Sequence, residues 1–260
     1  MPVIHSDAVT FVVAADAYDR FMGRYSQPLA PQLVEFAGVR AGQHVVDVGC
    51  GPGALTSELV ARLGADSVTA ADPSEPFVRA ARERHRGVEV ALAPAEDLPF
   101  GDDAFDAALA QLVVHFMKGP IAGLAEMRRV TRAGGVVAAS VWDHAGERSP
   151  LAPFWRVVRE LHPDAPDESD LAGTREGHLA ELLTAAGCAD VEEGALAVRV
   201  EHAAFDEWWQ PFTLGVGPAG AFVAGLDADA TEELRERCRA VLGDGPVVIP
   251  ARAWAARGRA

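Results

Sequence analysis

Residues 45–56 gather glycines and a carboxylate in a pattern that could hold a nucleotide-bearing small molecule. The apolar, β-branched run 45–48 contains Asp47, and Gly49, Gly51 and Gly53 follow at every second position before a helical pattern begins. Glycine reaches positive φ at little cost and has no Cβ, so a ligand can lie against bare backbone there. The stretch therefore predicts a strand, a ligand-binding loop and a helix start.

A second carboxylate stands at a spacing that suits a ribose. Asp72 ends the predicted strand 67–72 and lies 19 residues beyond Gly53. Dinucleotide-binding proteins place the acid that accepts the ribose hydroxyls at roughly 20 residues. The run from Gly49 to Ala54 also fits their glycine pattern. The loop alone therefore leaves a nicotinamide cofactor, another nucleotide-bearing cofactor and a purely structural turn open.

One histidine follows a predicted strand of the same sheet. The fourth strand runs out into Gln111 and then Val113-Val114-His115-Phe116, and the carboxyl ends of parallel strands are where ligands bind. An imidazole titrates near neutral pH, so His115 is a candidate general base that takes a proton from the substrate. The alternative is a structural histidine that hydrogen-bonds backbone where the strand turns to helix.

The elements that must position these groups alternate along the chain, which favours a parallel sheet with helices on both faces. Glycine and proline at positions 23, 28 and 31 are expected to interrupt the first helix. The predicted helices cover residues 7–38, 53–63, 75–86, 124–131, 150–161 and 175–186, and the predicted strands cover residues 45–48, 67–72, 88–92, 103–109, 136–142, 191–200 and 247 onward.

Charge and composition exclude several kinds of partner. The formal net charge is −15, whereas binding a nucleic-acid backbone needs clustered Lys and Arg. No run approaches the roughly 20 apolar residues that cross a bilayer, and residues 1–7 lack the basic and apolar regions of a signal peptide. We expect a cytoplasmic protein with no nucleic-acid or membrane partner. The oligomeric state stays open.

The three cysteines, Cys50, Cys188 and Cys238, have no paired spacing. They predict neither a disulfide framework nor a zinc site, and we expect no metal. Cys50 lies inside the glycine loop, where a nucleophile is conceivable. No histidine stands at a fixed spacing from it, so we interpret it as a small residue that a tight loop tolerates.

Flanking motifs separate the possible ligands. Three stretches resemble the class I S-adenosylmethionine-dependent methyltransferases, in their ubiquinone-biosynthesis-like, type 11 branch. They are Ala95-Glu96-Asp97-Leu98-Pro99-Phe100, the segment 126–135 and the Asp47 loop. The resemblance covers residues 18–142. It implies a doubly wound α/β fold with a seven-stranded Rossmann-like sheet, whose last two strands form an antiparallel pair, and with helical substrate or lid insertions.

The resemblance also implies a function, a single domain and its parts. We expect methyl transfer from S-adenosylmethionine to a small organic acceptor, with secondary metabolism as a further expectation. A cofactor-binding protein that catalyses cyclisation and a nicotinamide oxidoreductase are the alternatives. The domain spans residues 1–260. It comprises a helical cover at 1–40, a cofactor-binding core at 41–142, and the remaining sheet at 143–260 with insertions at about 143–174 and 204–244.

In this family the glycine loop cradles the methionine and ribose parts of the cofactor, and residues after the third strand meet the adenine. The branch often carries Asp where this chain has Pro94. Arg24 and the Tyr18 hydroxyl are candidates to hold the methionine carboxylate of the cofactor. They lie on a predicted helix that could equally be an ordinary amphipathic helix. The expected cofactor-binding residues are Tyr18, Arg24, Asp47, Gly49, Gly51, Gly53, Asp72, Pro73, Ala95, Glu96 and Gln111.

Aromatic side chains outside the sheet are candidates for the acceptor pocket. Residues 205, 208, 209 and 212 are aromatic at the spacing of one helix face, and the N-terminal segment 18–25 is also aromatic. Such residues line small-molecule pockets, although a stripe that faces the core is an equal alternative. The expected pocket residues are Tyr25, Trp142, Trp208, Trp209 and Phe212.

Overall fold

A computed structural model describes residues 15–165 and 167–260. Its strands are β1 (Val45–Val48), β2 (Val68–Asp72), β3 (Glu89–Leu92), β4 (Phe105–Gln111), β5 (Thr131–Trp142), β6 (Ala189–His202) and β7 (Val247–Arg259). They form one seven-stranded sheet in the order β3-β2-β1-β4-β5-β7-β6. The pairs from β3 to β5 are parallel, whereas β7 runs antiparallel to both β5 and β6. The predicted α/β fold class is confirmed, including the antiparallel last pair.

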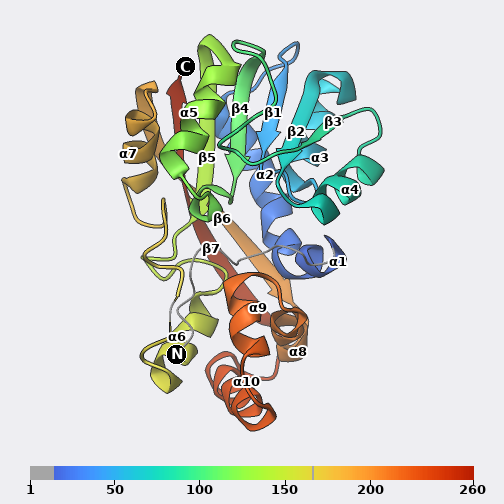
Figure 1. The fold of residues 1–260 in the computed structure, drawn as a ribbon. Coiled ribbons are helices and arrows are strands. Elements are labelled where there is room, and N and C mark those ends of the chain that lie inside the picture. Colours follow the sequence, from blue (N-terminus) through green and yellow to red (C-terminus); the bar gives the residue numbers. More distant parts are fainter. Residues whose placement is uncertain (1–14, 166) are drawn as a thin grey trace.

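Helices cover both faces of this sheet (Figure 1). The helices are α1 (Ala15–Tyr18), α2 (Arg24–Ala37), α3 (Ala54–Leu63), α4 (Glu75–Arg84), α5 (Pro120–Val130), α6 (Ala152–Leu161), α7 (His178–Ala185), α8 (Phe205–Trp209), α9 (Gly217–Ala224) and α10 (Ala228–Leu242). A π-helical segment, η2 (Asp19–Gly23), joins α1 to α2. Short 3-10 turns, η3 (Ala65–Ser67), η4 (Val114–Phe116) and η5 (Gln210–Leu214), complete the described elements.

Successive residues of the central strands belong to opposite cores because strand side chains alternate between the two faces. Val45 packs with α2, α3 and α4 in one hydrophobic cluster. Val46 packs with α5 and α7 in the other. All four residues of β1 are buried, as expected for a strand covered on both faces. The apolar run 45–48 is thus explained by the layers around it.

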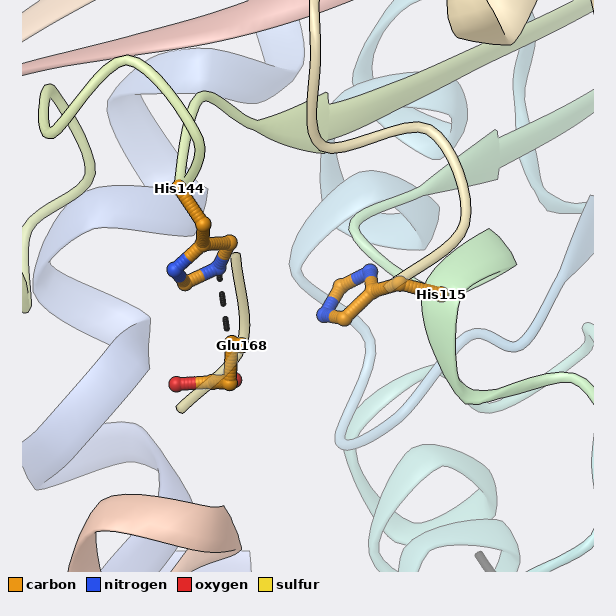
Figure 2. A group of neighbouring side chains, drawn as sticks. All are labelled: His115, His144 and Glu168. Carbon is orange, nitrogen blue, oxygen red and sulfur yellow. Dashed lines mark ion pairs between the residues drawn. The ribbon is translucent and has the colours of Figure 1, made fainter. Parts of the chain in front are cut away.

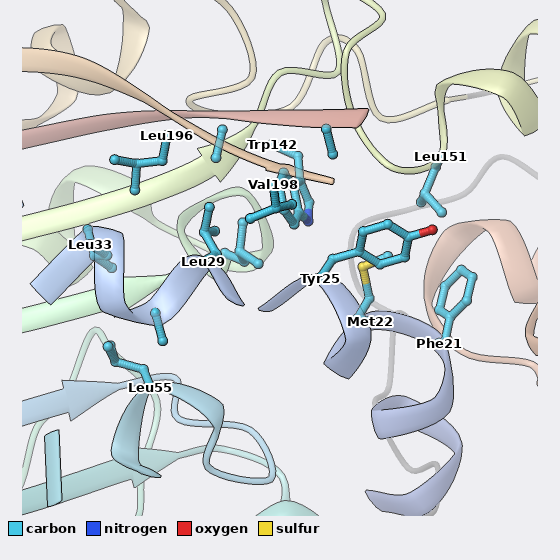
Figure 3. Close-up of a cluster of buried hydrophobic side chains, with 14 of the residues drawn as sticks. Phe21, Met22, Tyr25, Leu29, Leu33, Leu55, Trp142, Leu151, Leu196 and Val198 are labelled. Atoms are coloured by element: carbon cyan, nitrogen blue, oxygen red, sulfur yellow. The ribbon is translucent and has the colours of Figure 1, made fainter. Parts of the chain in front are cut away.

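Helix α2 links the N-terminal segment to the sheet. It contacts β4, β5, β6 and β7, and Figure 3 shows Leu29 and Leu33 pointing toward Leu196 and Val198 of β6. Both leucines are fully buried. At its N-terminal end, Phe21, Met22 and Tyr25 extend this cluster beyond the strand ends, so one continuous core joins the sheet to the cover above it.

The first helix differs from its prediction. Residues 7–14 of that prediction, like the signal-peptide argument on residues 1–7, lie outside the described residues. Pro28 and Pro31 lie inside α2 and do not break it. Pro28 is solvent-exposed and Pro31 half-buried, so water can reach the carbonyls that lack a donor, while burial of Leu29 and Leu33 stabilises the helix.

Several other predicted elements have different bounds; α5, for example, begins at Pro120 and not at residue 124. The fifth strand begins at Thr131 and not at 136, because Thr131 pairs with Phe105 before the register shifts and Val136 pairs with Ala107. The aromatic stripe 205–212 is not one helix: α8 ends at Trp209, and η5 continues with Pro211 near its start. Pro211 alone does not explain why η5 is a 3-10 helix and not a continuation of α8.

The inserted helices gather beyond one end of the sheet. Figure 1 shows α6, α8, α9 and α10 below the carboxyl ends of β1 and β4, with α1 beside them. The segment between β6 and β7 supplies α8 to α10. In the described part of the chain, no helix is long and apolar enough to span a membrane.

We predict that core packing under α2 dominates the stability of this fold. Leu33→Ala should lower the free energy of unfolding by about 2–5 kcal/mol, because it leaves a cavity in a close-packed core. Leu92, a leucine of β3 that is 54% exposed, provides the matched control, and Leu92→Ala should change stability by less than about 1 kcal/mol. Urea unfolding followed by circular dichroism measures both. Equal losses in the two variants would contradict the prediction.

Candidate active site

The loop after β1 is held in a conformation that requires glycine. Gly49, Gly51 and Gly53 have φ values of 74°, 53° and 100°. The amides of Gly49 and Cys50 both donate to the carbonyl of Ala71 on β2, at 2.7 and 3.1 Å. The bend is therefore fixed by the neighbouring strand before any ligand arrives.

The three glycines differ in what surrounds them. A Cβ on Gly49 would lie 2.4 Å from Val113, and a Cβ on Gly53 would lie 2.6 Å from His85 Nε2. A Cβ on Gly51 would meet no protein atom within 4 Å. Gly49 and Gly53 are thus required by protein packing, whereas the space above Gly51 is open to a ligand.

Two buried carboxyl groups flank this loop. Asp47 Oδ2 accepts a hydrogen bond from the Thr56 hydroxyl at 2.6 Å, while its Oδ1 is buried with no partner among the described residues. Asp72 accepts from the amides of Gly51 and Ser74, both at 2.8 Å. Burial raises the pKa of Asp47 to about 7 and that of Asp72 to about 6. Carboxylate oxygens accept more than one hydrogen bond, so both groups keep capacity for a ligand.

Three further residues predicted to bind the cofactor follow β2 and β3. Pro73 follows Asp72 and is exposed, Ala95 is buried, and Glu96 is half-buried. Glu96 Oε1 accepts a hydrogen bond from the Gly119 amide at 3.0 Å. The Glu96 side chain therefore connects the turn after β3 to the loop before α5.

The N-terminal residues predicted to hold the cofactor are engaged with protein. Tyr18 stacks edge-on against Phe77 of α4 with ring centroids 5.3 Å apart, and its pKa is raised, mainly by burial and then by Asp72. Arg24 donates to His202 Nδ1 at 3.3 Å and pairs with Glu207 of α8 at 2.5 Å. The Arg24 guanidinium thus links α2 to the insertion.

Polar groups also gather at the ends of β4 and β5. Gln111 Nε2 donates to the carbonyl of Ser26 at 3.0 Å, and its Oε1 has no partner among the described residues. His115 lies on η4 and is 8% exposed, and its Nδ1 likewise lacks a partner in the described chain. Burial, and then His144, lower the pKa of His115 well below its usual value. The imidazole is therefore neutral at physiological pH.

His144 and Glu168 complete this half of the edge. His144 follows β5 directly after Asp143, and burial lowers its pKa as well. Glu168 comes from the loop between α6 and α7, and its Oε2 accepts from the Trp155 indole at 3.0 Å. Figure 2 shows the rings of His115 and His144 facing each other above the Glu168 carboxylate.

The residues predicted to line the acceptor pocket fall into two groups. Tyr25 lies edge-on to Trp142 with centroids 6.5 Å apart, and its hydroxyl is hydrogen-bonded to His202 Nε2 at 2.9 Å. Its pKa is raised by burial. Trp142 ends β5, and its indole nitrogen has no partner within the described residues. This pair lies next to the N-terminal segment (Figure 3).

The second group forms an aromatic cluster. Trp208, Trp209 and Phe212 are 2%, 5% and 2% exposed. Phe212 stacks on Phe154 of α6 at 4.5 Å and meets Phe21 edge-on at 5.1 Å. The segment 18–25 and the insertion are therefore in contact, as expected of a shared pocket wall, but these three side chains pack mainly on one another. Their role toward the acceptor stays a prediction.

Sequence reasoning missed several residues of this edge. His144 stands two residues after the fifth strand, so the strand-end rule that selected His115 would have selected it too. The same rule would have selected His202, which ends β6, whereas Glu168 carries no such signal. Arg84 was also missed: it donates to the Pro52 carbonyl at 2.9 Å and pairs with Asp19 at 2.6 Å, which ties the glycine loop to the N-terminal segment.

The glycine loop and its acids lie at the carboxyl ends of β1 and β2, and the histidine pair lies beyond the ends of β4 and β5. The family model described as "Methyltransferase domain" matches residues 46–139. The chain is 31% identical over 177 residues to demethylmenaquinone methyltransferase of Paenarthrobacter aurescens, spanning 61% of this chain and 67% of that protein. It is 31% identical over 208 residues to the ubiquinone/menaquinone biosynthesis C-methyltransferase UbiE of Cupriavidus taiwanensis, spanning 73% and 84%.

The chain belongs to the S-adenosylmethionine-dependent methyltransferase family. S-adenosylmethionine is its cofactor, which decides the choice that the glycine spacing left open. The residues fit this cofactor: the space above Gly51 is open, Asp47 Oδ1 is unpartnered, and Asp72 has acceptor capacity beside the loop.

The fold itself is shared more widely. The crystal structure of the [4+2]-cyclase SpnF superposes with a TM-score of 0.56 at 20% identity, covering 90% of this chain and 81% of that one. A protein named as a cyclase thus has the same fold as this methyltransferase. The fold alone therefore does not separate methyl transfer from cyclisation.

We predict that the open space above Gly51 belongs to the cofactor. Gly51→Ala should keep the fold but weaken binding of S-adenosylhomocysteine at least about tenfold, because the added methyl group takes up ligand space. Gly42 offers a matched control: it has φ 84° and open space around its Cβ but lies before β1, at the opposite edge. Backbone strain of about 1–2 kcal/mol is expected in both variants. Calorimetric titration decides; equal affinity in both variants would contradict the prediction.

Proposed function

We propose that this methyltransferase methylates a small organic acceptor bound beside the ends of β4 and β5, with the cofactor over β1 and β2. The observation that supports this most is how the polar groups divide along the carboxyl edge. The glycine loop, Asp47 and Asp72 lie on one side. Buried polar atoms without partners among the described residues, in Gln111, His115 and Trp142, lie on the other.

On the cofactor side, we assign the ribose hydroxyls to Asp72 and the methionine part to the loop amides near Gly51. Ala95, Glu96 and Pro73 border the adenine in this proposal, and Tyr18 closes the site from α1. Bound S-adenosylmethionine supplies a methyl group on a sulfonium, which is already a good leaving group. The chain's task is then to align the acceptor and exclude water, and the N-terminal cover is placed for both.

On the acceptor side, the acidic net charge of −15 supports a small molecule over a nucleic acid. A cytoplasmic location and a place in secondary metabolism stay predictions from the sequence. The relatives' printed names mention quinones, so quinone-type rings belong in a test panel beside phenols, amines and carboxylic acids. Tyr25 and Trp142 are the aromatic groups that we assign to the acceptor.

Incubation with methyl-labelled S-adenosylmethionine and this panel tests the proposal. Label transferred to one acceptor class, together with matching release of S-adenosylhomocysteine, is the expected result. Gly51→Ala should lose the transfer and Gly42→Ala should keep it. Tight cofactor binding with no label transfer and no S-adenosylhomocysteine, but with conversion of a substrate, would instead favour the cyclisation alternative.

We predict that cofactor affinity depends on pH through Asp72. Burial raises the pKa of this carboxyl to about 6, so it is ionised at pH 8 and protonated at pH 5. A protonated acid loses its charge-assisted bonds to the ribose hydroxyls, worth about 1.5–3 kcal/mol. Affinity for S-adenosylhomocysteine should therefore fall as the pH drops from 8 to 5.

The variant Asp72→Asn isolates this effect. It should bind roughly tenfold or more weakly at pH 8, where the wild type gains most from the charge. In Asp72→Asn the pKa of Asp47 should be lower than in the wild type, because, after burial, the nearby Asp72 charge is one of the causes that raise it. Calorimetric titration from pH 5 to 8 measures both proteins, and thermal unfolding checks their folds. An unchanged affinity in a folded variant would place the ribose acid elsewhere.

The hypothesis that His115 takes a proton from the acceptor stays a prediction. Because the pKa of His115 is lowered, the imidazole stays neutral from pH 9 to below 6.5. Protonation of His115 should therefore not lower the wild-type rate over that range. A general base assists by about 10²–10⁴ in rate. His115→Ala and His115→Gln should both lose turnover of that order once an acceptor is known. Folded variants that keep turnover within a few fold across pH 6–9 would exclude the base role.

A further inference from the structure

We propose that His115, His144 and Glu168 bind one divalent first-row transition-metal ion at the ends of β4 and β5. One candidate ligand atom from each side chain lies within 4.8 Å of the others, and all three side chains are buried. They come from three separate segments, η4, the turn after β5 and the loop before α7. Only the fold brings them together (Figure 2).

The spacing leaves a gap the size of one atom. His144 Nε2 and Glu168 Oε1 are 4.0 Å apart, and the two imidazole rings have centroids 5.9 Å apart. The distance from His144 Nε2 to Glu168 Oε1 is too long for a direct hydrogen bond. Around one metal ion with bonds of about 2.0–2.2 Å, ligand atoms stand roughly 3.0–3.5 Å apart. Small side-chain rotations toward a shared centre would close the difference.

Two ring nitrogens of this cluster, His115 Nδ1 and His144 Nε2, have no hydrogen-bond partner among the described residues. His144 Nε2 is buried with no hydrogen-bond partner in the described chain, and it faces the gap. Glu168 is 3% exposed, and none of the described ion pairs joins it to an arginine or lysine. A buried carboxylate without a cation is costly. A divalent ion would supply both the charge and the missing bonds.

A second layer of contacts holds the carboxylate in place. The Trp155 indole of α6 donates to Glu168 Oε2, which leaves Oε1 directed at His144. Outer hydrogen bonds of this kind orient metal-binding side chains. The neighbouring acids are committed elsewhere: Asp143 pairs with Arg252 and Asp167 with Arg159. Glu168 is thus the acid that is placed to serve as a ligand.

Two imidazoles and one carboxylate select the type of ion. This set suits zinc, iron, cobalt or manganese and leaves coordination positions open, whereas magnesium prefers oxygen ligands alone. If the proposed methyl transfer holds, an open position would bind an oxygen atom of the acceptor and lower its pKa. His115 would then hold the ion, and the base role predicted above for His115 would apply only to the metal-free protein. This role rests on the proposed function, but the metal site itself does not.

Metal binding is measured without cofactor or acceptor. Full-length protein, freed of metal with chelator and dialysed, is titrated with Co²⁺ or Zn²⁺ in a calorimeter, and visible absorption follows Co²⁺. We expect one saturable site per chain, new Co²⁺ absorption bands, a higher melting temperature with metal, and no saturation by Mg²⁺. Heat without saturation, or equal binding of Mg²⁺, would overturn the proposal.

Variants locate the site. Glu168→Gln and His144→Ala should weaken metal binding by about tenfold or more, and Trp155→Phe by about 10–100-fold. His44 is exposed before β1, so His44→Ala is the matched control and should bind as the wild type does. If His144→Ala does not fold, Glu168→Gln provides the test, because glutamine keeps the shape of the glutamate side chain and removes its charge. Loss of binding in His44→Ala, or its survival in Glu168→Gln, would place the ion elsewhere.

A separate titration with S-adenosylhomocysteine distinguishes the two proposals. Cofactor binding without metal binding would overturn the metal site and leave the proposed function standing. Metal binding without cofactor binding would do the reverse. Glu168→Gln should keep its affinity for S-adenosylhomocysteine in either case, because Glu168 lies on the acceptor side of the edge.

Discussion

The bend after β1 is the constraint on which the rest of the site depends. The Ala71 carbonyl receives both the Gly49 and the Cys50 amides, and the Asp72 carboxylate receives the Gly51 amide. The second strand therefore fixes the loop and places its own terminal acid beside it. Because these bonds are made within the protein, the cofactor meets a preformed surface and little ordering entropy opposes its binding.

The cover over this surface is built from elements far apart in the chain. Tyr18 packs on Phe77 of α4, Arg24 pairs with Glu207 of α8, and Phe21 meets Phe212 of η5. The N-terminal segment is thus fastened to the cofactor half and to the insertion by separate contacts. These contacts hold the N-terminal segment against both α4 and the insertion.

Much of this architecture could be predicted from the sequence because its signals are local. The glycine loop, the strand-ending Asp72 and His115, and the alternation of strands and helices each depend on neighbouring residues. Pro28 and Pro31 were misleading because burial of the opposite helix face outweighs two lost hydrogen bonds. The aromatic stripe 205–212 predicts a buried face. It does not show whether that face contacts the core or a pocket, because both give the same sequence pattern.

The rest of the site could not be predicted because its groups meet only in three dimensions. Glu168 lies in a polar loop with no periodic pattern, 24 residues beyond His144. Its significance comes from burial and from the Trp155 indole, neither of which a spacing reveals. Arg84 illustrates the same limit, because only the folded chain shows that this helix arginine donates to the glycine loop.

The buried acids of the described chain follow a division between structure and ligand binding. They are Asp47, Asp72, Asp143 and Glu168. Asp143 is paired with Arg252, and this pair joins β5 to β7 with no ligand required. The other three have only neutral partners: a hydroxyl, two backbone amides and an indole. Neutral donors offset only part of the cost of burying a carboxylate. These three acids all lie at the carboxyl edge of the sheet. Their oxygens can therefore accept further hydrogen bonds at the edge where ligands bind.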